Sequence, residues 1–378
     1  MLFAHMRRLF LVFILVLAAV PLLANGGGAS SNTREFSGGT VSYFAANEGE
    51  IWRTDGTPEG TRFFAAAAAG QYAMLPIAYQ GKVIFFGAAM SPRGTDVYVS
   101  DGAATRRIAS IDALWGPLAV TLFRDRVYFA TEAVYSGEQA RLWVTDGTAA
   151  GTEVVAELGE SADPALVATD ERLFVSVYEE GDYRWSESIW ASDGTTAGTS
   201  RIAEGLQQYP PITRVGEVVL FYGEDGQVWR SDGTAEGTYA LGGESFVTGG
   251  TAAWILDCEG RLFRSDGSAA GTVEVWDFLE SVQLVGANET GKVFLTWWGD
   301  TGAGLIALDP AARVYVWLAR ETTSGMRAVA AIGETLYFTT DRPELGQELW
   351  RSDGTAAGTG VVRDIAPGAA ISYPSDFT

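Results

Sequence analysis

A short phrase returns at regular intervals along most of the sequence. In its clearest form, residues 349–355, it consists of an apolar residue, a tryptophan, one variable residue, a serine or threonine, and then Asp-Gly-Thr. Eight copies are recognised by their aspartates, which are Asp55, Asp101, Asp146, Asp193, Asp232, Asp266, Asp309 and Asp353. Their mean spacing is about 43 residues, and a period of this length is typical of a unit of four short strands. Such a chain is constrained to fold as a series of similar small sheets.

Each period contains a second signal, an apolar and aromatic run before the motif, as in Val83–Phe86 and Leu336–Phe338. Turn-forming residues precede these runs, and a further β-rich segment such as Glu153–Ala156 follows the motif. No stretch after residue 30 has the sustained apolar period of a helix. The sequence therefore predicts an all-β fold, an eight-bladed β-propeller of four-stranded antiparallel blades. The copies at Asp101 and Asp309 have lost part of the motif, which leaves a seven-bladed propeller as the alternative.

The two ends of the chain favour a closed fold. The C-terminal residues Tyr373–Thr378 align with Tyr209–Thr213, where the chain runs on into the apolar run Val218–Phe221. The N-terminal part starts at the matching place, with Ser37–Gly39 followed by an apolar run. We therefore expect the last residues to supply the first strand of the blade that the first residues complete. Such pairing of the N- and C-terminal strands removes exposed sheet edges, and residues 36–378 then form a single propeller domain of eight repeats.

The first residues have the pattern of an export signal. Two arginines precede an apolar run over 9–24, which is shorter than the roughly 20 residues that a membrane-spanning helix needs. We expect a signal peptide over 1–24, or alternatively 1–29, followed by a flexible segment over 25–35. The mature protein is then exported without a membrane span, to the periplasm, the cell surface or the extracellular space.

Rare residue types exclude several kinds of chemistry. The one histidine, His5, lies in the expected signal peptide, and the one cysteine is Cys258. The mature chain therefore lacks the imidazole that Ser-His-Asp catalysis, Cys-His catalysis and histidine-ligated zinc require. A formal net charge of −21 repels phosphate backbones, so nucleic acid is not an expected partner. We expect Cys258 to be a small buried apolar residue.

The repeated Asp-Gly-Thr turn is interpreted as structural. Aspartate accepts hydrogen bonds from backbone N–H groups two residues on, glycine adopts positive φ, and threonine closes the turn. A second glycine, such as Gly151, is expected to let the loop bend back into the next strand. The preceding tryptophan is expected to pack against the neighbouring blade. The turn residues given this structural role are Asp55, Asp101, Asp146, Asp193, Asp232, Asp266 and Asp353.

The last copy of the motif carries a family resemblance. Its E-L-W-R-S-D-G-T phrase at 348–355, followed by A-A-G-T and V-R-D-I-A-P-G, resembles the E-L-W-x-x-D-G-T repeat family of exported bacterial proteins. The resemblance covers nearly all of residues 36–378 and implies a secreted repeat propeller, and the family has no assigned activity to carry over. A weaker similarity to the Asp-box hairpins of sialidases, in Ser192–Thr195, implies a structural hairpin and transfers no catalysis.

The variable loops before the tryptophan strand are the candidate binding regions, because they occupy one phase of the repeat and should share one face. Residues 179–185 form the most promising of them, with acids, an arginine and aromatic rings that can stack on sugars. We assign ligand binding there to Tyr183, Arg184 and Trp185. No catalytic residue, metal ligand or cofactor is assigned. Excess carboxylates allow weak Ca²⁺ association, although each repeat turn offers only one carboxylate.

These observations favour one function and leave two alternatives. The favoured function is an exported, non-catalytic and monomeric binding module for a surface glycan or for an envelope or extracellular protein. The first alternative is a carbohydrate-active hydrolase or lyase that uses carboxylates. The second alternative is a structural repeat protein for adhesion or surface assembly.

Overall fold

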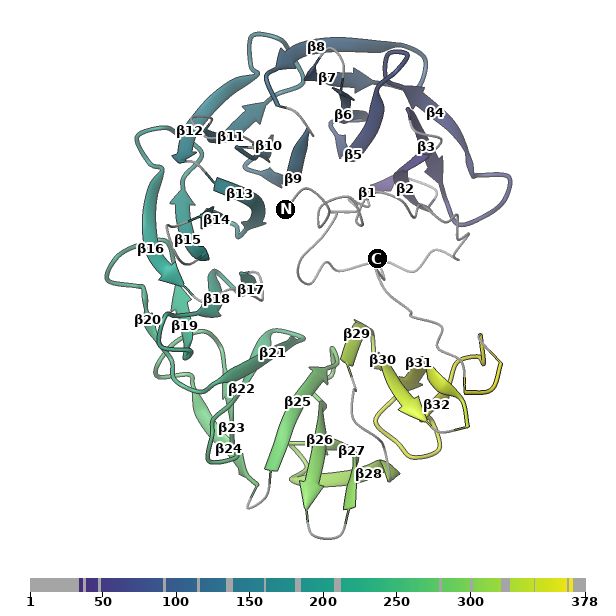
Figure 1. Cartoon of the computed structure of the whole chain (residues 1–378), viewed down its shortest axis with the longest axis vertical. Coiled ribbons are helices and arrows are strands. Elements are labelled where there is room, and N and C mark those ends of the chain that lie inside the picture. The colour runs from purple at the N-terminus through teal and green to yellow at the C-terminus, as the bar shows by residue number, and fades with distance from the viewer. Residues whose placement is uncertain are drawn as a thin grey trace. The chain divides into compact units, whose positions relative to one another are not determined.

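The strands are arranged in eight sheets that follow chain order. The computed structural model describes residues 34–36, 39–46, 49–90, 93–113, 116–133, 139–159, 161–180, 185–206, 212–278, 281–299, 302–320, 327–342, 344–365 and 367–369. Every regular element in these ranges is a β-strand, and the strands form eight four-stranded antiparallel sheets (Figure 1). Each sheet consists of four consecutive strands in sequence order, so one repeat forms one sheet. This confirms the predicted all-β fold of an eight-bladed β-propeller and sets aside the seven-bladed alternative.

The chain divides into two compact units, which we describe separately. Within the described residues the first unit comprises 34–166 and 177–180, and the second comprises 167–176 and 185–369. We number the sheets one to eight in chain order. Sheets one to three belong to the first unit, sheets five to eight belong to the second, and sheet four has residues in both.

The first three sheets contain the strands β1 to β12. Sheet one consists of β1 (Arg34–Phe36), β2 (Gly39–Ala46), β3 (Glu50–Thr54) and β4 (Arg62–Ala66). Sheet two consists of β5 (Tyr72–Tyr79), β6 (Lys82–Met90), β7 (Arg93–Ser100) and β8 (Thr105–Ile111). Sheet three consists of β9 (Pro117–Phe123), β10 (Arg126–Thr131), β11 (Ala140–Thr145) and β12 (Glu153–Gly159).

The next three sheets contain β13 to β24. Sheet four consists of β13 (Ser161–Ala168), β14 (Leu173–Glu180), β15 (Trp185–Ser192) and β16 (Ser200–Leu206). Sheet five consists of β17 (Thr213–Val215), β18 (Val218–Tyr222), β19 (Val228–Ser231) and β20 (Tyr239–Ala240). Sheet six consists of β21 (Ser245–Gly249), β22 (Ala252–Leu256), β23 (Arg261–Ser265) and β24 (Val273–Asp277).

The last two sheets contain β25 to β32. Sheet seven consists of β25 (Ser281–Ala287), β26 (Val293–Gly299), β27 (Gly302–Asp309) and β28 (Val314–Arg320). Sheet eight consists of β29 (Arg327–Ile332), β30 (Thr335–Arg342), β31 (Gly346–Ser352) and β32 (Gly360–Val361).

Each antiparallel sheet has two distinct ends. The turns between its first and second strands, and between its third and fourth strands, lie at one end, which we call the turn end. The connection between the second and third strands lies at the opposite end, which we call the loop end, and so does the connection to the next sheet. The Asp-Gly-Thr motif joins third and fourth strands and therefore lies at the turn end. The predicted variable loops join second and third strands and belong to the loop end.

The second strands are buried on both faces, as β6 shows. Phe85 lies in a cluster with Ile51 of sheet one, whereas Ile84 and Phe86 lie in a cluster with Phe129 of sheet three. The rings of Phe86 and Phe129 are 4.8 Å apart. Because the side chains of a strand point alternately to its two faces, a strand packed between two sheets must be apolar at every position. This explains the continuous apolar runs of the sequence.

The same alternation recurs in the second unit. Phe294 of β26 packs with Phe338 of sheet eight, whereas Val293 and Leu295 pack with Trp254 of sheet six. Each of these hydrophobic clusters is therefore shared by two consecutive sheets.

The motif tryptophans lie at the margins of these clusters. Trp143 stacks on Phe129, with ring centroids 5.9 Å apart, and packs against the cluster that sheets two and three share. Trp229 and Trp350 pack in the same way against the clusters of their own sheets with the preceding ones. These contacts agree with the expected packing against a neighbouring blade.

The first strand of sheet one comes from the N-terminal segment. β1 pairs with β2, and Arg34 lies opposite Val41. Arg34–Phe36 thus takes the place that was expected for the last residues of the chain, and Arg34 and Glu35 form a strand rather than part of the expected flexible segment. The expected C-terminal strand over 373–378 and the expected signal peptide lie outside the described residues. In the ranges given above, no helix is long and apolar enough to cross a membrane.

Candidate functional site

The repeated turn uses its polar groups internally, as the copy in sheet three shows. Asp146 Oδ1 accepts hydrogen bonds from the Thr148 backbone N–H at 2.9 Å and the Thr148 hydroxyl at 2.6 Å. Gly151 N–H donates to Thr148 Oγ1 at 3.1 Å, and the hydroxyls of Thr145 and Thr152 are 2.7 Å apart. The hydrogen bond from the Thr148 side chain is the main reason why the pKa of Asp146 lies below its usual value. The same hydrogen bonds to the carboxylate recur at Asp55, Asp193, Asp232, Asp266 and Asp353.

The two glycines of the turn have different roles. Gly147 has a φ of 80°, a backbone conformation that favours glycine. At Gly151 the constraint is space, because a Cβ there would overlap the carboxylate of Asp146. The second glycine therefore makes room for the aspartate, whereas bending of the loop was the role expected for it.

The two degenerate copies keep a shortened version of the turn. Asp101 accepts hydrogen bonds from the backbone N–H groups of Ala103 and Ala104, at 2.9 and 2.8 Å. Asp309 accepts one from Ala312 N–H at 2.9 Å, and Arg313 then adopts a φ of 54°. An aspartate at this position therefore closes the turn even where the threonine of Asp-Gly-Thr is lost, with Gly102 kept after Asp101 and Pro310 following Asp309.

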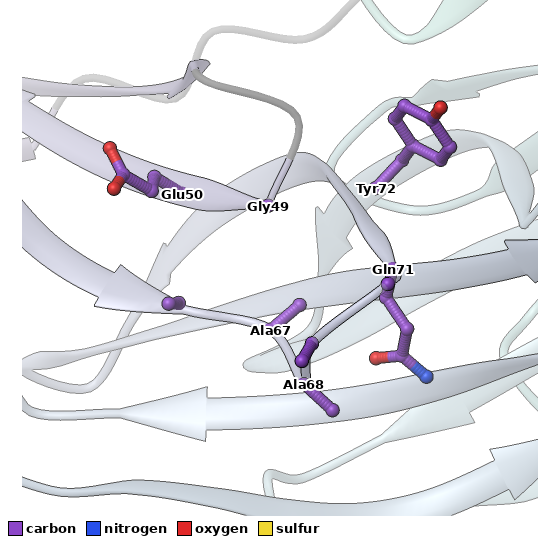
Figure 2. Close-up of a pocket in the computed structure, with 9 residues that line it drawn as sticks. Gly49, Glu50, Ala67, Ala68, Gln71 and Tyr72 are labelled. Atoms are coloured by element: carbon purple, nitrogen blue, oxygen red, sulfur yellow. The ribbon is translucent and has the colours of Figure 1, made fainter.

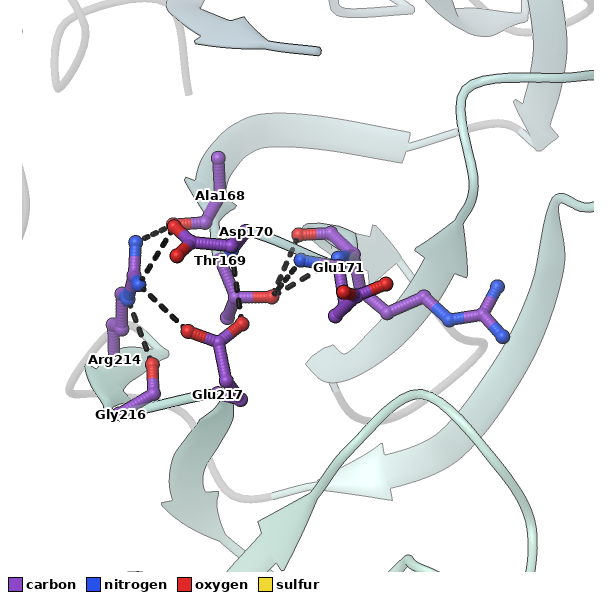
Figure 3. Close-up of polar contacts among 8 residues, drawn as sticks. Ala168, Thr169, Asp170, Glu171, Arg214, Gly216 and Glu217 are labelled. Carbon is purple, nitrogen blue, oxygen red and sulfur yellow. Dashed lines mark hydrogen bonds and ion pairs between the residues drawn. The ribbon is translucent and has the colours of Figure 1, made fainter.

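Polar groups at the turn ends also link neighbouring sheets, and Arg214 makes the most extensive link (Figure 3). Its guanidinium donates to the carbonyl oxygens of Ala168 and Gly216, at 3.0 and 2.8 Å. It also pairs with Asp170 at 3.1 Å and with Glu217 at 3.0 Å. Glu217 accepts a further hydrogen bond from the Asp170 backbone N–H at 2.9 Å. These bonds join the first turns of sheets four and five.

Sheets two and three, and sheets seven and eight, have simpler links of this kind. Tyr79 donates its hydroxyl to the Asp125 carbonyl oxygen at 2.7 Å, and the Asn288 side chain donates to the Glu334 carbonyl oxygen at 2.7 Å. At these three pairs of sheets, polar groups of the turn end hold neighbouring sheets together.

The predicted ligand-binding loop is only partly described. Tyr183 and Arg184 lie outside the described residues. Trp185 is the first residue of β15, and its side chain is not described. Ligand binding by these three residues stays a prediction.

A pocket opens at the loop end of the first unit, where sheet one connects to sheet two (Figure 2). Its volume is about 290 Å³. Figure 2 shows the side chains of Glu50 and Tyr72 on either side of Gly49, with Ala67 and Ala68 nearby. The pocket is lined by Gly49, Glu50, Ala66, Ala67, Ala68, Ala69, Gly70, Gln71 and Tyr72.

The wall of the pocket is held by backbone hydrogen bonds. Ala67 N–H donates to the Gly49 carbonyl oxygen at 2.9 Å, and Gln71 N–H donates to the Ala68 carbonyl oxygen at 3.1 Å. A side chain at Gly49 would press against the Gln71 carbonyl oxygen, 2.9 Å from the added Cβ. Small residues therefore keep this connection close to β3 and leave the pocket open.

A polar network behind the wall fixes Gln71. Its side-chain N–H donates to Asp96 Oδ2 at 2.9 Å, and its side-chain oxygen accepts the Tyr98 hydroxyl at 2.8 Å. The Tyr98 hydroxyl also accepts the Ala68 backbone N–H at 3.3 Å. Asp96 is further bonded by Ser110 and by Arg107, the latter at 3.4 Å. Sheet two thus anchors the connection at two points.

The electrostatics of this network keep Asp96 ionised. Burial raises its pKa, but hydrogen bonds from Ser110 and Gln71 and the charge of Arg107 outweigh burial, so the pKa lies below its usual value. A carboxylate held in this way can position its neighbours. It is poorly suited to donate a proton as a general acid.

The front of the pocket combines an acid with an aromatic ring. Glu50 Oε2 accepts the Trp52 indole N–H at 2.8 Å, which orients the carboxylate. The Tyr72 side chain is 45% exposed. The lining thus offers a carboxylate for hydroxyl or ammonium donors, an exposed aromatic ring on the other side of Gly49, and small apolar walls. Such a lining can bind a compact ligand that is polar at its rim and apolar on one face.

Sequence reasoning missed this pocket. Glu50 occupies a motif position, and Gln71 and Tyr72 lie in a connection between repeats that carried no recognised motif. One sequence feature could have indicated the pocket, namely the run of five alanines over 65–69. Small side chains let backbone segments approach closely and leave space beside them for a ligand.

Two titratable groups outside the pocket have raised pKa values, the thiol of Cys258 and the carboxyl of Glu187. Cys258 is exposed rather than buried, because it lies in the turn between β22 and β23, and the charge and hydrogen bond of Glu244 raise the pKa of its thiol. Glu187 of β15 is largely buried. Desolvation raises its pKa to about 7, although a hydrogen bond with Ser176 favours the charged form.

Within the described part of the chain, no group of three or more histidine, cysteine, aspartate or glutamate residues is placed to hold a metal ion. The aspartates of the repeat turns accept the hydrogen bonds of their own turn through Oδ1, as at Asp146, and Asp232 also pairs with Arg230 at 3.1 Å. These residues give Ca²⁺ no multidentate carboxylate site.

Comparisons with known proteins give structural likenesses only. No protein-family model matches the sequence, and no curated protein matches it. One similar solved structure is puromycin hydrolase, with 15% sequence identity and a TM-score of 0.39 over 80% of this chain and 55% of that chain. A second is the β-propeller domain of the Trilobed protease from Pyrococcus furiosus, with 13% identity and a TM-score of 0.38 over 91% of this chain and 98% of that chain. A third is BamB from Moraxella catarrhalis, with 13% identity and a TM-score of 0.41 over 81% of this chain and 92% of that chain. The chain thus spans about half the length of puromycin hydrolase. Likenesses at these TM-scores transfer no activity.

Proposed function

We propose that this protein is an exported binding module whose pocket at Glu50 and Tyr72 holds one sugar residue of a surface glycan. The observation that carries the proposal is the presence of an oriented carboxylate and an exposed aromatic ring in the lining of one pocket of about 290 Å³. This volume is at the lower end for small-molecule pockets and suits one ring rather than a long chain.

The chemistry of the pocket narrows the sugar. Glu50 accepts hydrogen bonds from hydroxyl or ammonium groups, and the Tyr72 ring offers a surface for the apolar face of a pyranose. The formal net charge of −21 opposes acidic sugars. Neutral sugars and amino sugars are therefore the preferred class.

The pocket supports binding better than hydrolysis. A glycosidase needs two carboxyl groups about 5 to 9.5 Å apart, one of them protonated. Glu50 is the only acidic residue among those that line the pocket, and Asp96 behind it is held ionised by its hydrogen bonds. The enzyme alternative is therefore the weaker proposal.

Export and family membership are part of the proposal. The basic and apolar pattern before residue 25 supports an export signal, and the recurring motif supports membership of the E-L-W-x-x-D-G-T repeat family. Two alternatives are binding of an envelope or extracellular protein instead of a glycan, and a purely structural role in adhesion. Both predict that the pocket binds no sugar.

Binding of purified residues 30–378 to arrayed polysaccharides tests the proposal. We expect selective binding to neutral or amino-sugar polymers, and Tyr72→Ala should weaken it by about tenfold, as for loss of a stacking ring. Phe63→Ala is the matched control, since Phe63 is 52% exposed on β4 and does not line the pocket. Equal binding by the Tyr72 variant, or no binding by folded protein, would overturn the assignment.

A second variant separates the pocket from the loop at 179–185. The double change Tyr183→Ala and Trp185→Ala should weaken affinity if this loop contacts the same glycan. If affinity survives that double change while Tyr72→Ala lowers it, the pocket alone carries the interaction and the loop assignment is wrong. Parallel measurements with calcium and with a chelator test for weak Ca²⁺ dependence.

A further inference from the structure

One tryptophan at the loop end of sheet seven has an exposed ring. Trp298 of β26 is 38% exposed, although tryptophan is highly buried on average. It lies opposite Ser281 of β25. Ser281 and Gln283, the next residue on the same face of β25, are both exposed. Directly opposite residues have Cβ atoms about 4.5 to 5.5 Å apart, and long side chains also reach diagonal neighbours. A ring, a hydroxyl and an amide therefore lie side by side, and we call Ser281, Gln283 and Trp298 the tryptophan platform.

A buried hydroxyl lies one residue pair further from the loop end. Thr296 is opposite Gln283, and it shares the face of Trp298, because side chains two positions apart on a strand point the same way. Thr296 is 6% exposed, and its Oγ1 makes no hydrogen bond within the described part of the chain. A buried hydroxyl without a partner costs free energy, and such groups are uncommon. Thr296 thus has hydrogen-bonding capacity for a ligand beside the platform.

A second hydroxyl of this kind faces sheet seven from sheet eight. Phe294 and Phe338 pack in the cluster that these two sheets share. Thr296 follows Phe294 by two residues, and Thr340 follows Phe338 by two residues, in ladders that are regular there. Both threonines therefore line the loop-end side of the interface between the sheets. Thr340 is 1% exposed, and its Oγ1 likewise has no hydrogen-bond partner among the described residues.

The charges at this interface favour an uncharged ligand. On the same face of sheet eight, Arg342 follows Thr340 by two residues and Glu348 lies opposite Thr340. The Arg342 guanidinium lies over the Trp350 ring at 5.2 Å, and Glu348 is fully buried. One charge of each sign thus faces sheet seven here, and the platform itself has no charged side chain. An exposed aromatic ring beside hydroxyl and amide groups matches the apolar face and hydroxyl rim of a neutral pyranose.

We propose that the tryptophan platform is a second saccharide-binding site, specific for neutral sugars. A pyranose ring stacks on Trp298, its hydroxyl groups bond to the Gln283 amide, and one of them enters the interface between the sheets and bonds to Thr296. The platform lies in the second unit and shares no residue with the pocket of the first unit. It is therefore tested separately from the function proposed for that pocket.

Calorimetric titration with neutral hexasaccharides tests the platform. The probes are linear hexamers of glucose, mannose and N-acetylglucosamine. The purified protein carries Tyr72→Ala, so that the pocket of the first unit contributes little. We expect saturable binding of at least one hexamer, and Trp298→Ala in addition should weaken it by about tenfold, as for loss of a stacking ring. No binding of any of the three, or binding of a glucosamine hexamer alone, would overturn the proposal.

Two further variants separate ligand binding from folding. Thr296→Val keeps the shape of the side chain and removes only the hydroxyl. Stability should not fall, because that hydroxyl has no partner in the described protein, whereas affinity should fall several-fold. Tyr315→Ala is the control, since Tyr315 is 49% exposed on β28 of the same sheet and lies opposite Leu308, near the turn end. It should change affinity less than about twofold. Unchanged affinity in Thr296→Val, or equal losses in Trp298→Ala and Tyr315→Ala, would overturn the assignment.

Discussion

The carboxylate of Asp146 occupies the space that a side chain at Gly151 would need. The two residues are five positions apart at opposite sides of one turn, and the carboxylate is held there by both the backbone and the hydroxyl of Thr148. The same relationship holds between Asp55 and Gly60, Asp193 and Gly198, Asp232 and Gly237, Asp266 and Gly271, and Asp353 and Gly358.

Gly151→Ala should therefore destabilise the protein by about 1 to 3 kcal/mol, the usual cost of overpacking, measured by urea denaturation. Gly360→Ala is the control, because a Cβ at Gly360 meets nothing within 4 Å. In an Asp146→Ala background the cost of Gly151→Ala should largely disappear. An unchanged cost in that background would show that backbone conformation, rather than the carboxylate, excludes alanine.

Glu187 should make stability depend on pH near neutrality. Its pKa in the folded protein is about 7, above the ordinary value of 4.5, so between these values the folded state holds a proton that the unfolded state has released. Stability should therefore fall as pH rises from about 4.5 to 7, by up to about 3 kcal/mol.

Glu187→Gln should remove this fall, and thermal denaturation between pH 4 and 8 measures it. The variant should match the parent protein at low pH and exceed it at pH 8. Glu157→Gln, at an exposed position, serves as the control. A parent protein with a flat profile across this range would contradict the prediction.

Arg214→Lys should lower stability by about 1 kcal/mol, although the positive charge is kept. A lysine cannot reproduce the planar set of donors that bonds two carbonyl oxygens and two carboxylates. Most of the loss should persist at high salt, because exposed ion pairs contribute only about 0 to 1 kcal/mol. Arg141→Lys, which alters a single looser pair at 3.6 Å, should cost less than about 0.5 kcal/mol. Equal losses would contradict a special role for Arg214.

Tyr98→Phe should weaken sugar binding without contacting the sugar. The hydroxyl bonds Gln71 and Ala68, so its removal loosens the wall of the pocket while the ring still stacks on Phe85. We expect a loss of several-fold in affinity by calorimetry. Tyr43→Phe, which keeps the ring contact with Phe64, should leave affinity unchanged. Full affinity in the Tyr98 variant would show that the network does not shape the pocket.

The fold could be predicted because its signals are local and repeated. The run Val83–Phe86 predicted a strand, and its lack of alternation is explained by burial on both faces between sheets one and three. The turn at Asp146 could be predicted from residue types alone. Repetition strengthens each local prediction. Where one copy has lost most of the motif, as at Asp309, the intact copies still predict the strands and the turn expected there.

The pocket could not be predicted because it depends on contacts between repeats. Gln71 and Asp96 are 25 residues apart, and Gln71 lies in a connection outside the recurring motif. Burial of Cys258 was predicted from residue type and was wrong, since the turn that carries it is exposed. The pattern of a single sequence indicates which face of a strand is buried, but it does not indicate which loops lie in contact with one another.

The shared clusters also bear on how such a chain gains and loses length. Phe85 contributes to one cluster and its neighbours Ile84 and Phe86 to the next, so the hydrophobic units are offset from the sequence repeats. Deleting one whole repeat brings together two faces that have the same pattern, whereas deleting half a repeat leaves an apolar face without a partner. Duplication and loss in a gene of this kind are therefore tolerated in whole periods, although a breakpoint can fall anywhere within the period.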